Sequence, residues 1–151
     1  TTTTLPEPSA GALAAEPSVY DPFGDQSEHE RDLPKLVDGD VNTSWRTERY
    51  FDPLSQIGKP GVGITFRVSG APGLIELRGS PQTGYTVLWA ETVPPDFEDW
   101  ETIGSGTVLD APSRLQLPSR DGGVWLLWLT DLPEQTADEF FSRISEVVFR
   151  P

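Results

Sequence analysis

Apolar and polar positions alternate over much of the chain with the period of a β-strand. In residues 61–68, Val62, Ile64, Phe66 and Val68 point one way. Residues 124–129 (VWLLWL) are apolar at every position, which predicts a central strand covered on both faces. Further strands are expected at residues 73–78, 85–91, 100–103, 107–109, 114–117 and 143–150. Short strands at about ten-residue spacing, with no helical period, predict an all-β, antiparallel β-sandwich of the jelly-roll type.

The N-terminal residues lack this pattern. Residues 1–17 are rich in Thr, Pro and Ala and hold almost no large apolar side chain, which predicts a flexible linker. The sandwich is expected over residues 18–151, with a polar, irregular arm at 18–32 and a helical turn from Asp32 to Gly39. Methionine is absent even at position 1, so we expect a piece of a longer protein whose membrane anchor lies outside it.

The amino-acid composition limits the partners and the catalytic or metal sites that the chain can have. The net charge of −13, from 24 acidic and 11 basic residues, repels phosphate backbones and excludes nucleic acid as an expected partner. Cysteine is absent, and the single histidine, His29, stands in the polar arm, so we expect no catalytic triad and no histidine zinc site. We therefore expect no catalytic residue. A carboxylate pair for glycoside hydrolysis stays open, because acidic residues are abundant.

The stretch Val37–Trp45 (VDGDVNTSW) carries oxygen-bearing side chains at alternate positions. It begins like an EF-hand loop but has Thr43 where that loop needs Gly and Arg49 where it needs Glu. Two readings remain open for this turn. It either holds Ca²⁺ or closes on its own backbone N–H groups.

The DGD-x-x-T-x-W pattern resembles the opening motif of the discoidin, or coagulation factor 5/8 C-type, family of galactose-binding-like domains. Family 32 carbohydrate-binding modules open similarly. The resemblance covers about residues 30–151 and includes a late glutamate in the closing strand. It implies one structural Ca²⁺ and no other cofactor, with ligands from the backbone carbonyl of Leu36 and the side chains of Asp38, Asp40, Thr43 and Glu146.

Three stretches give a narrower resemblance. VYDPFGD, VDGDVNTSWRTERY and IGKPGVGI look like the C-terminal extracytoplasmic domain of actinobacterial MviN/MurJ-type lipid II flippase proteins. That resemblance implies a domain at the extracytoplasmic face of the cell membrane, within a membrane protein of peptidoglycan assembly. It also implies a glycan, a peptidoglycan precursor or an envelope protein as partner, and we expect the chain itself to be a monomer.

The segment 45–51 is the candidate binding surface, because it contains both aromatic rings and arginine guanidinium groups, which can bind carboxylates or phosphates in a bidentate manner. The expected ligand-contacting residues are Arg46, Glu48, Arg49, Tyr50 and, in an acidic loop, Trp100. In the alternative reading Tyr50 and Trp100 cover the core and Arg46 pairs with Glu48; Trp45, Trp125 and Trp128 are expected in the core. A non-catalytic binding module is the first functional hypothesis. The alternatives are a purely structural or protein-docking domain without a small ligand, and a carboxylate-dependent glycan hydrolase.

Overall fold

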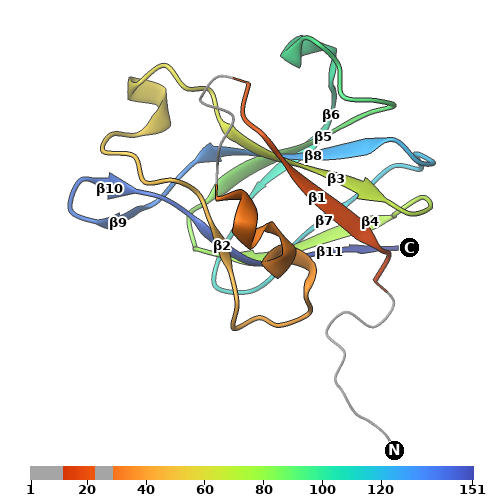
Figure 1. Cartoon of the computed structure of the whole chain (residues 1–151), viewed down its shortest axis with the longest axis horizontal. Coiled ribbons are helices and arrows are strands. Elements are labelled where there is room, and N and C mark those ends of the chain that lie inside the picture. The colour runs from red at the N-terminus through yellow and green to blue at the C-terminus, as the bar shows by residue number, and fades with distance from the viewer. Residues whose placement is uncertain (1–11, 23–28) are drawn as a thin grey trace, which may run out of the picture.

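Two antiparallel sheets form the molecule, which is the predicted β-sandwich (Figure 1). The computed structural model describes residues 12–22 and 29–151. The larger sheet has, in spatial order, β1 (Ala15–Tyr20), β3 (Val62–Val68), β8 (Val124–Asp131), β5 (Gly84–Ala90) and β6 (Glu101–Thr107). The smaller sheet has β2 (Trp45–Arg46), β11 (Arg143–Arg150), β4 (Leu74–Gly79) and β7 (Ser113–Gln116). A hairpin of β9 (Glu134–Thr136) and β10 (Glu139–Phe140) extends from one end.

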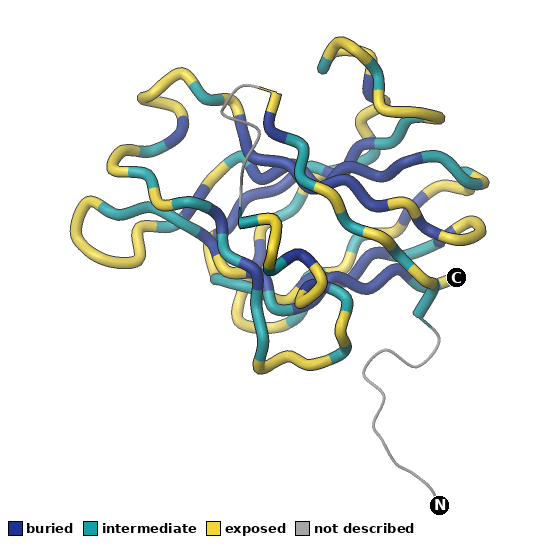
Figure 2. The backbone as a smooth tube through the Cα atoms, in the orientation of Figure 1, coloured by how far each residue is buried: buried dark blue, intermediate teal, exposed yellow. Residues whose placement is uncertain are grey.

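The main core lies between the two sheets. The four alternating side chains predicted to share a face of β3 are all buried in it. Across the sandwich, Phe149 of β11 meets Phe66 of β3 and Trp125 of β8, with ring centroids 5.3 and 6.4 Å apart. Figure 2 shows the buried stretches running along the middle of both sheets. This packing of large apolar side chains is the main stabilising term of the fold.

Strand β8 is apolar at every position because both of its faces are covered. Its alternate residues Val124, Leu126 and Trp128 join a second, smaller core on the outer face of the larger sheet. Gly63 of β3 permits this close packing, since a Cβ there would lie 2.9 Å from the side chains of Leu126 and Trp128. The prediction of a central, doubly covered strand is confirmed, because β8 lies between β3 and β5.

The N-terminal boundary differs from the expectation. Strand β1 starts at Ala15 and pairs along its whole length with β3, and Leu13 N–H donates to the Phe149 carbonyl at 2.8 Å. The sandwich therefore includes residues assigned to the linker, and the arm is regular up to Tyr20. Pro17 fits because β1 is an edge strand. The rest of the expected linker, residues 1–11, and arm residues 23–28 lie outside the described residues.

The separate strands expected at 100–103 and 107–109 are also wrong, because one strand, β6, spans Glu101–Thr107. Its glycines serve packing rather than strand termination. At Gly106, a Cβ would lie 2.6 Å from the Tyr85 hydroxyl, so glycine makes room for that ring. Leu109, beyond the strand, is exposed.

The described helices are short 3₁₀ segments, η1 (Glu30–Val37), η2 (Leu54–Gln56) and η3 (Phe97–Asp99). Among the described residues no helix has the length and apolar character needed to cross a bilayer. Helix η1 contacts both β1 and β11 and buries Leu33 and Leu36. It thereby fixes the position of the loop that follows it, residues 38–43.

Candidate functional site

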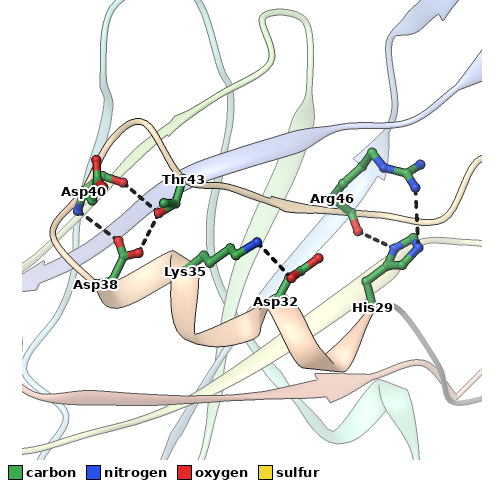
Figure 3. Close-up of polar contacts among 7 residues, drawn as sticks. All are labelled: His29, Asp32, Lys35, Asp38, Asp40, Thr43 and Arg46. Atoms are coloured by element: carbon green, nitrogen blue, oxygen red, sulfur yellow. Dashed lines mark hydrogen bonds and ion pairs between the residues drawn. The ribbon is translucent and has the colours of Figure 1, made fainter.

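The loop 38–43, called the DGD loop below, is closed by its own side chains (Figure 3). The Asp38 carboxylate accepts the Asp40 N–H at 2.9 Å and the Thr43 hydroxyl at 2.5 Å. Asp40 Oδ1 accepts the Asn42 N–H at 2.9 Å. Gly39 has φ of 76°, a left-handed conformation that glycine adopts without steric cost. The loop therefore shows the Asx-turn closure that was one of the two readings of the sequence.

Glu146 of β11 lies beneath this loop and is only 3% exposed. Burial raises the pKa of its carboxyl to about 7, with Asp38 and Asp40 adding to the rise and the Gly39 N–H bond and Arg78 opposing it. One oxygen, Oε1, is buried without a hydrogen-bond partner. The structure thus brings the start of the domain against its last strand, as the family resemblance implied.

The oxygen atoms at this contact fit a hard cation such as Ca²⁺. The unpartnered Glu146 oxygen beside Asp38 is the observation that favours a bound cation, because a buried, unsatisfied carboxylate oxygen is costly. In the arrangement seen, however, the oxygens of Asp38 accept bonds inside the turn, and no three acidic, His or Cys side chains of the described residues already surround one point. Leu36, the expected carbonyl ligand, is buried at the end of η1.

Glu146 and Asp38 are also neighbouring carboxylates, one with a raised pKa, which is the pair that a glycan hydrolase would need. At 3% exposure, Glu146 is out of reach of a glycosidic oxygen, so this pair does not support hydrolysis.

Arg46 is the centre of the predicted binding surface and is half-buried. Its guanidinium lies 5.2 Å from the centre of the Phe141 ring, and one of its nitrogens is buried without a partner. His29 Nδ1–H donates to the Arg46 carbonyl at 2.7 Å (Figure 3). Burial, followed by the charges of Arg49 and Arg143, lowers the pKa of the Arg46 guanidinium. The charges of Arg46, Arg49 and Arg143 therefore repel one another, and the carboxylates of Asp32 and Glu139 offset part of that repulsion.

The neighbouring predicted residues lie against the β9–β10 hairpin. Tyr50 exchanges backbone hydrogen bonds with Phe140 at 2.9 and 2.7 Å, and its hydroxyl accepts Lys59 Nζ at 2.9 Å. Arg49 is exposed and lies 3.5 Å from the Glu139 carboxylate. Glu48 lines a hollow that it shares with His29 and η1. The structure therefore places Arg46 and Glu48 beside His29, and Arg49 and Tyr50 beside the β9–β10 hairpin.

Trp100 does not belong to this surface. It is 5% exposed, lies in the outer core of the larger sheet, and donates its indole N–H to the Tyr20 hydroxyl at 3.1 Å. Trp100 is therefore removed from the ligand-contacting set, because Tyr20 of β1 covers it. Trp45, Trp125 and Trp128 are core residues as predicted.

A groove of about 360 Å³ opens beside the DGD loop, between the ends of β4 and β11 and the loop that joins β6 to β7. Neither Arg78 nor Arg143 was predicted at a site, since no motif marks an isolated arginine at a strand end. The alternation along each strand indicates that both arginine side chains point away from the core. That the two residues line one groove depends on the pairing of β4 with β11. The residues that line the groove include Val41, Asn42, Arg78, Leu109, Asp110 and Arg143.

Similar solved structures identify the architecture. CpGH89CBM32-6, produced by Clostridium perfringens, matches with a TM-score of 0.60 and 15% identity over 89% of this chain and 91% of that chain. The two chains share the β-sandwich fold. The CBM32 of AlyQ, in complex with 4,5-unsaturated mannuronic acid, has a TM-score of 0.56 and 16% identity, over 91% and 94% of the two chains.

A pectin-binding carbohydrate-binding module also shares this sandwich, with a TM-score of 0.57 and 12% identity over 93% of this chain and 91% of that chain. At such identities the likeness establishes the fold, and function has to be argued from the site. No protein-family model and no curated protein sequence matches the chain.

Proposed function

We propose that this chain is a non-catalytic, glycan-binding module. The observation that carries the proposal is the open groove of about 360 Å³, lined by charged and polar groups, on a sandwich with the fold of carbohydrate-binding modules. Its volume is in the range of about 300–1,000 Å³ typical of small-ligand sites. Arginine forks and amide groups suit sugar hydroxyls and acidic substituents.

The biological setting is proposed from the sequence. The resemblance to the C-terminal domain of MviN/MurJ-type flippase proteins supports a place at the extracytoplasmic face of the membrane. A peptidoglycan precursor or a cell-wall glycan is then the natural ligand class. Binding of mannuronic acid and of pectin by structural neighbours supports a glycan ligand in general.

The DGD loop is proposed as a structural Ca²⁺ clamp. Asp38, Asp40 and Thr43 would offer side-chain oxygens from the loop, Leu36 its carbonyl, and Glu146 the oxygen that has no partner. A bound cation would offset the mutual repulsion of the acidic groups and tie the loop to β11. Its role would be stability of the groove wall, because Asn42 of the same loop lines the groove.

A glycan array with bacterial cell-wall saccharides, followed by calorimetry on the best binder, tests the proposal. We expect saturable binding of at least one cell-wall saccharide and no release of reducing ends on long incubation. Absence of binding to every saccharide, at millimolar concentration and with Ca²⁺ present, would contradict it.

One observation favours protein docking as the second candidate. Phe51 and Ile57, in the loop next to the Arg46 surface, are 71% and 46% exposed. Exposed apolar side chains on a loop are common at protein interfaces. Loss of envelope-protein capture on replacing Phe51 by Ser, with saccharides never bound, would favour this function.

A further inference from the structure

The groove beside the DGD loop holds two arginines on neighbouring strands. Arg78 comes near the end of β4 and Arg143 begins β11. Ser80 N–H donates to the Arg143 carbonyl at 2.8 Å, and Arg143 N–H donates to Ser80 Oγ at 3.0 Å. These bonds fix the two strand ends, and both arginines are among the residues that line the groove.

Neither arginine makes an ion pair within the described part of the chain. Several other arginines do form ion pairs, since Arg114 lies 2.7 Å from the Glu76 carboxylate and Arg120 lies 2.6 Å from that of Glu101. The chain has a net charge of −13 and abundant carboxylates, yet no carboxylate of residues 12–22 and 29–151 lies within ion-pair distance of these two arginines. Their unused donors are available to a ligand.

Positive charge continues past the groove. The guanidinium of Arg143 lies 5.7 Å from the centre of the Phe141 ring, which Arg46 approaches at 5.2 Å. The repulsion between these like charges is offset in part by Asp32 and Glu139, and an anion at the groove would offset more of it.

The remaining wall of the groove matches a sugar ring. Asn42 and Asp110 offer amide and carboxylate groups for hydroxyls. Val41 and Leu109, which are 44% and 57% exposed, offer apolar contacts for the C–H face of a pyranose. A simple anion would leave these groups unused.

We propose that the groove binds a glycan through an anionic substituent, a carboxylate or a phosphate on the sugar, held by Arg78 and Arg143. This inference names the ligand class of the proposed glycan-binding function and rests on it. Guanidinium groups bind both kinds of anion in a bidentate manner. The net charge of the chain repels extended polyanions, so a sugar with an isolated charge suits the groove better than a nucleic acid does.

Calorimetric titration of the whole chain with matched sugars tests the inference. N-acetylmuramic acid carries a lactyl carboxylate on a ring otherwise equal to N-acetylglucosamine, and N-acetylglucosamine 6-phosphate places a phosphate on the same ring. We expect each acidic sugar to bind about tenfold or more tightly than N-acetylglucosamine, because charged hydrogen bonds are the stronger ones. The acidic sugar that binds more tightly shows whether carboxylate or phosphate is the preferred anion.

Arg143→Gln and Arg78→Gln should each remove most of this preference while the variant stays folded, which a cooperative thermal transition would verify. Arg67→Gln is the matched control, because Arg67 is exposed on β3 of the other sheet, makes no ion pair among the described residues and changes the net charge equally. It should leave affinity within about twofold.

Four results would overturn the inference. Equal affinity for acidic and neutral sugars would exclude anion selection and leave the proposed glycan binding intact. If Arg67→Gln loses as much affinity for the acidic sugars as the groove variants do, the preference comes from the net charge of the protein and not from the groove. If inorganic phosphate binds as tightly as the phosphorylated sugar, the groove recognises the anion alone and not the sugar ring. If no sugar binds at all, the proposed function fails together with the inference.

Discussion

Glu146→Gln tests the contact between the DGD loop and the last strand. The wild-type carboxyl is buried next to Asp38, and its pKa is raised from 4.5 to about 7. At about 1.4 kcal/mol per pKa unit, ionising this group in the folded protein costs up to about 3 kcal/mol. Glutamine keeps the shape and an oxygen that accepts the Gly39 N–H, but it carries no charge.

The sign of the pH dependence follows from the raised pKa. Between pH 4.5 and about 7 the folded protein holds this proton while the unfolded chain releases it. The free energy of unfolding therefore falls as pH rises through that window, and the loss is complete above it. Above pH 7 and in EDTA, Glu146→Gln should be more stable than wild type by up to about 3 kcal/mol.

Urea unfolding at several pH values, in EDTA and in millimolar Ca²⁺, measures both effects. If Ca²⁺ binds, it stabilises the wild type and the advantage of the variant shrinks or reverses, because a ligand selective for the folded state adds stability. Exposed Glu91→Gln is the control and should follow the wild-type pH dependence. Identical pH slopes for wild type and Glu146→Gln in EDTA would refute the buried, like-charged environment described for this group.

Changes at three further places in the chain test the fold. Leu127→Asp should destabilise by about 3 kcal/mol or more, since it places an unpaired charge in the main core; a soluble variant with unchanged melting temperature would contradict the central strand. Asp38→Ala and Thr43→Ala should each cost about 1 kcal/mol in EDTA, because the exposed loop loses its internal hydrogen bonds; two neutral variants would remove the metal-free closure. A deletion through Pro17 should lower the melting temperature relative to one through Gly11, because half of β1 is lost; equal melting temperatures would show that this half contributes nothing.

Hydrophobic periodicity was enough to predict most of the sandwich. VWLLWL is apolar on both faces, and the structure supplies a core on each side of it. The same rule failed for Ala15–Tyr20, whose sequence AEPSVY contains Pro17 and a glutamate. An edge strand accepts proline because only one side of its backbone needs a partner, and edge position is a property of the whole topology.

The candidate site was predictable only where a motif marked it. The DGD pattern placed the loop, and the family resemblance brought Glu146 to it from about a hundred residues away, a closure that local propensity does not encode. Trp100 was misplaced because its acidic neighbours suggested exposure, whereas Tyr20 covers its ring. Arg78 and Arg143 form one groove wall through strand pairing, so their meeting required the three-dimensional structure.

The central claim, a glycan-binding groove beside the DGD loop, is tested most directly by nuclear magnetic resonance. Amide chemical shifts of the isotope-labelled chain would be followed during titration with the N-acetylglucosamine–N-acetylmuramic acid disaccharide. We predict saturable shifts that cluster at the groove, around Asn42, Arg78, Asp110 and Arg143. The absence of saturable shifts, or shifts confined to the opposite sheet around Arg67, would contradict the account.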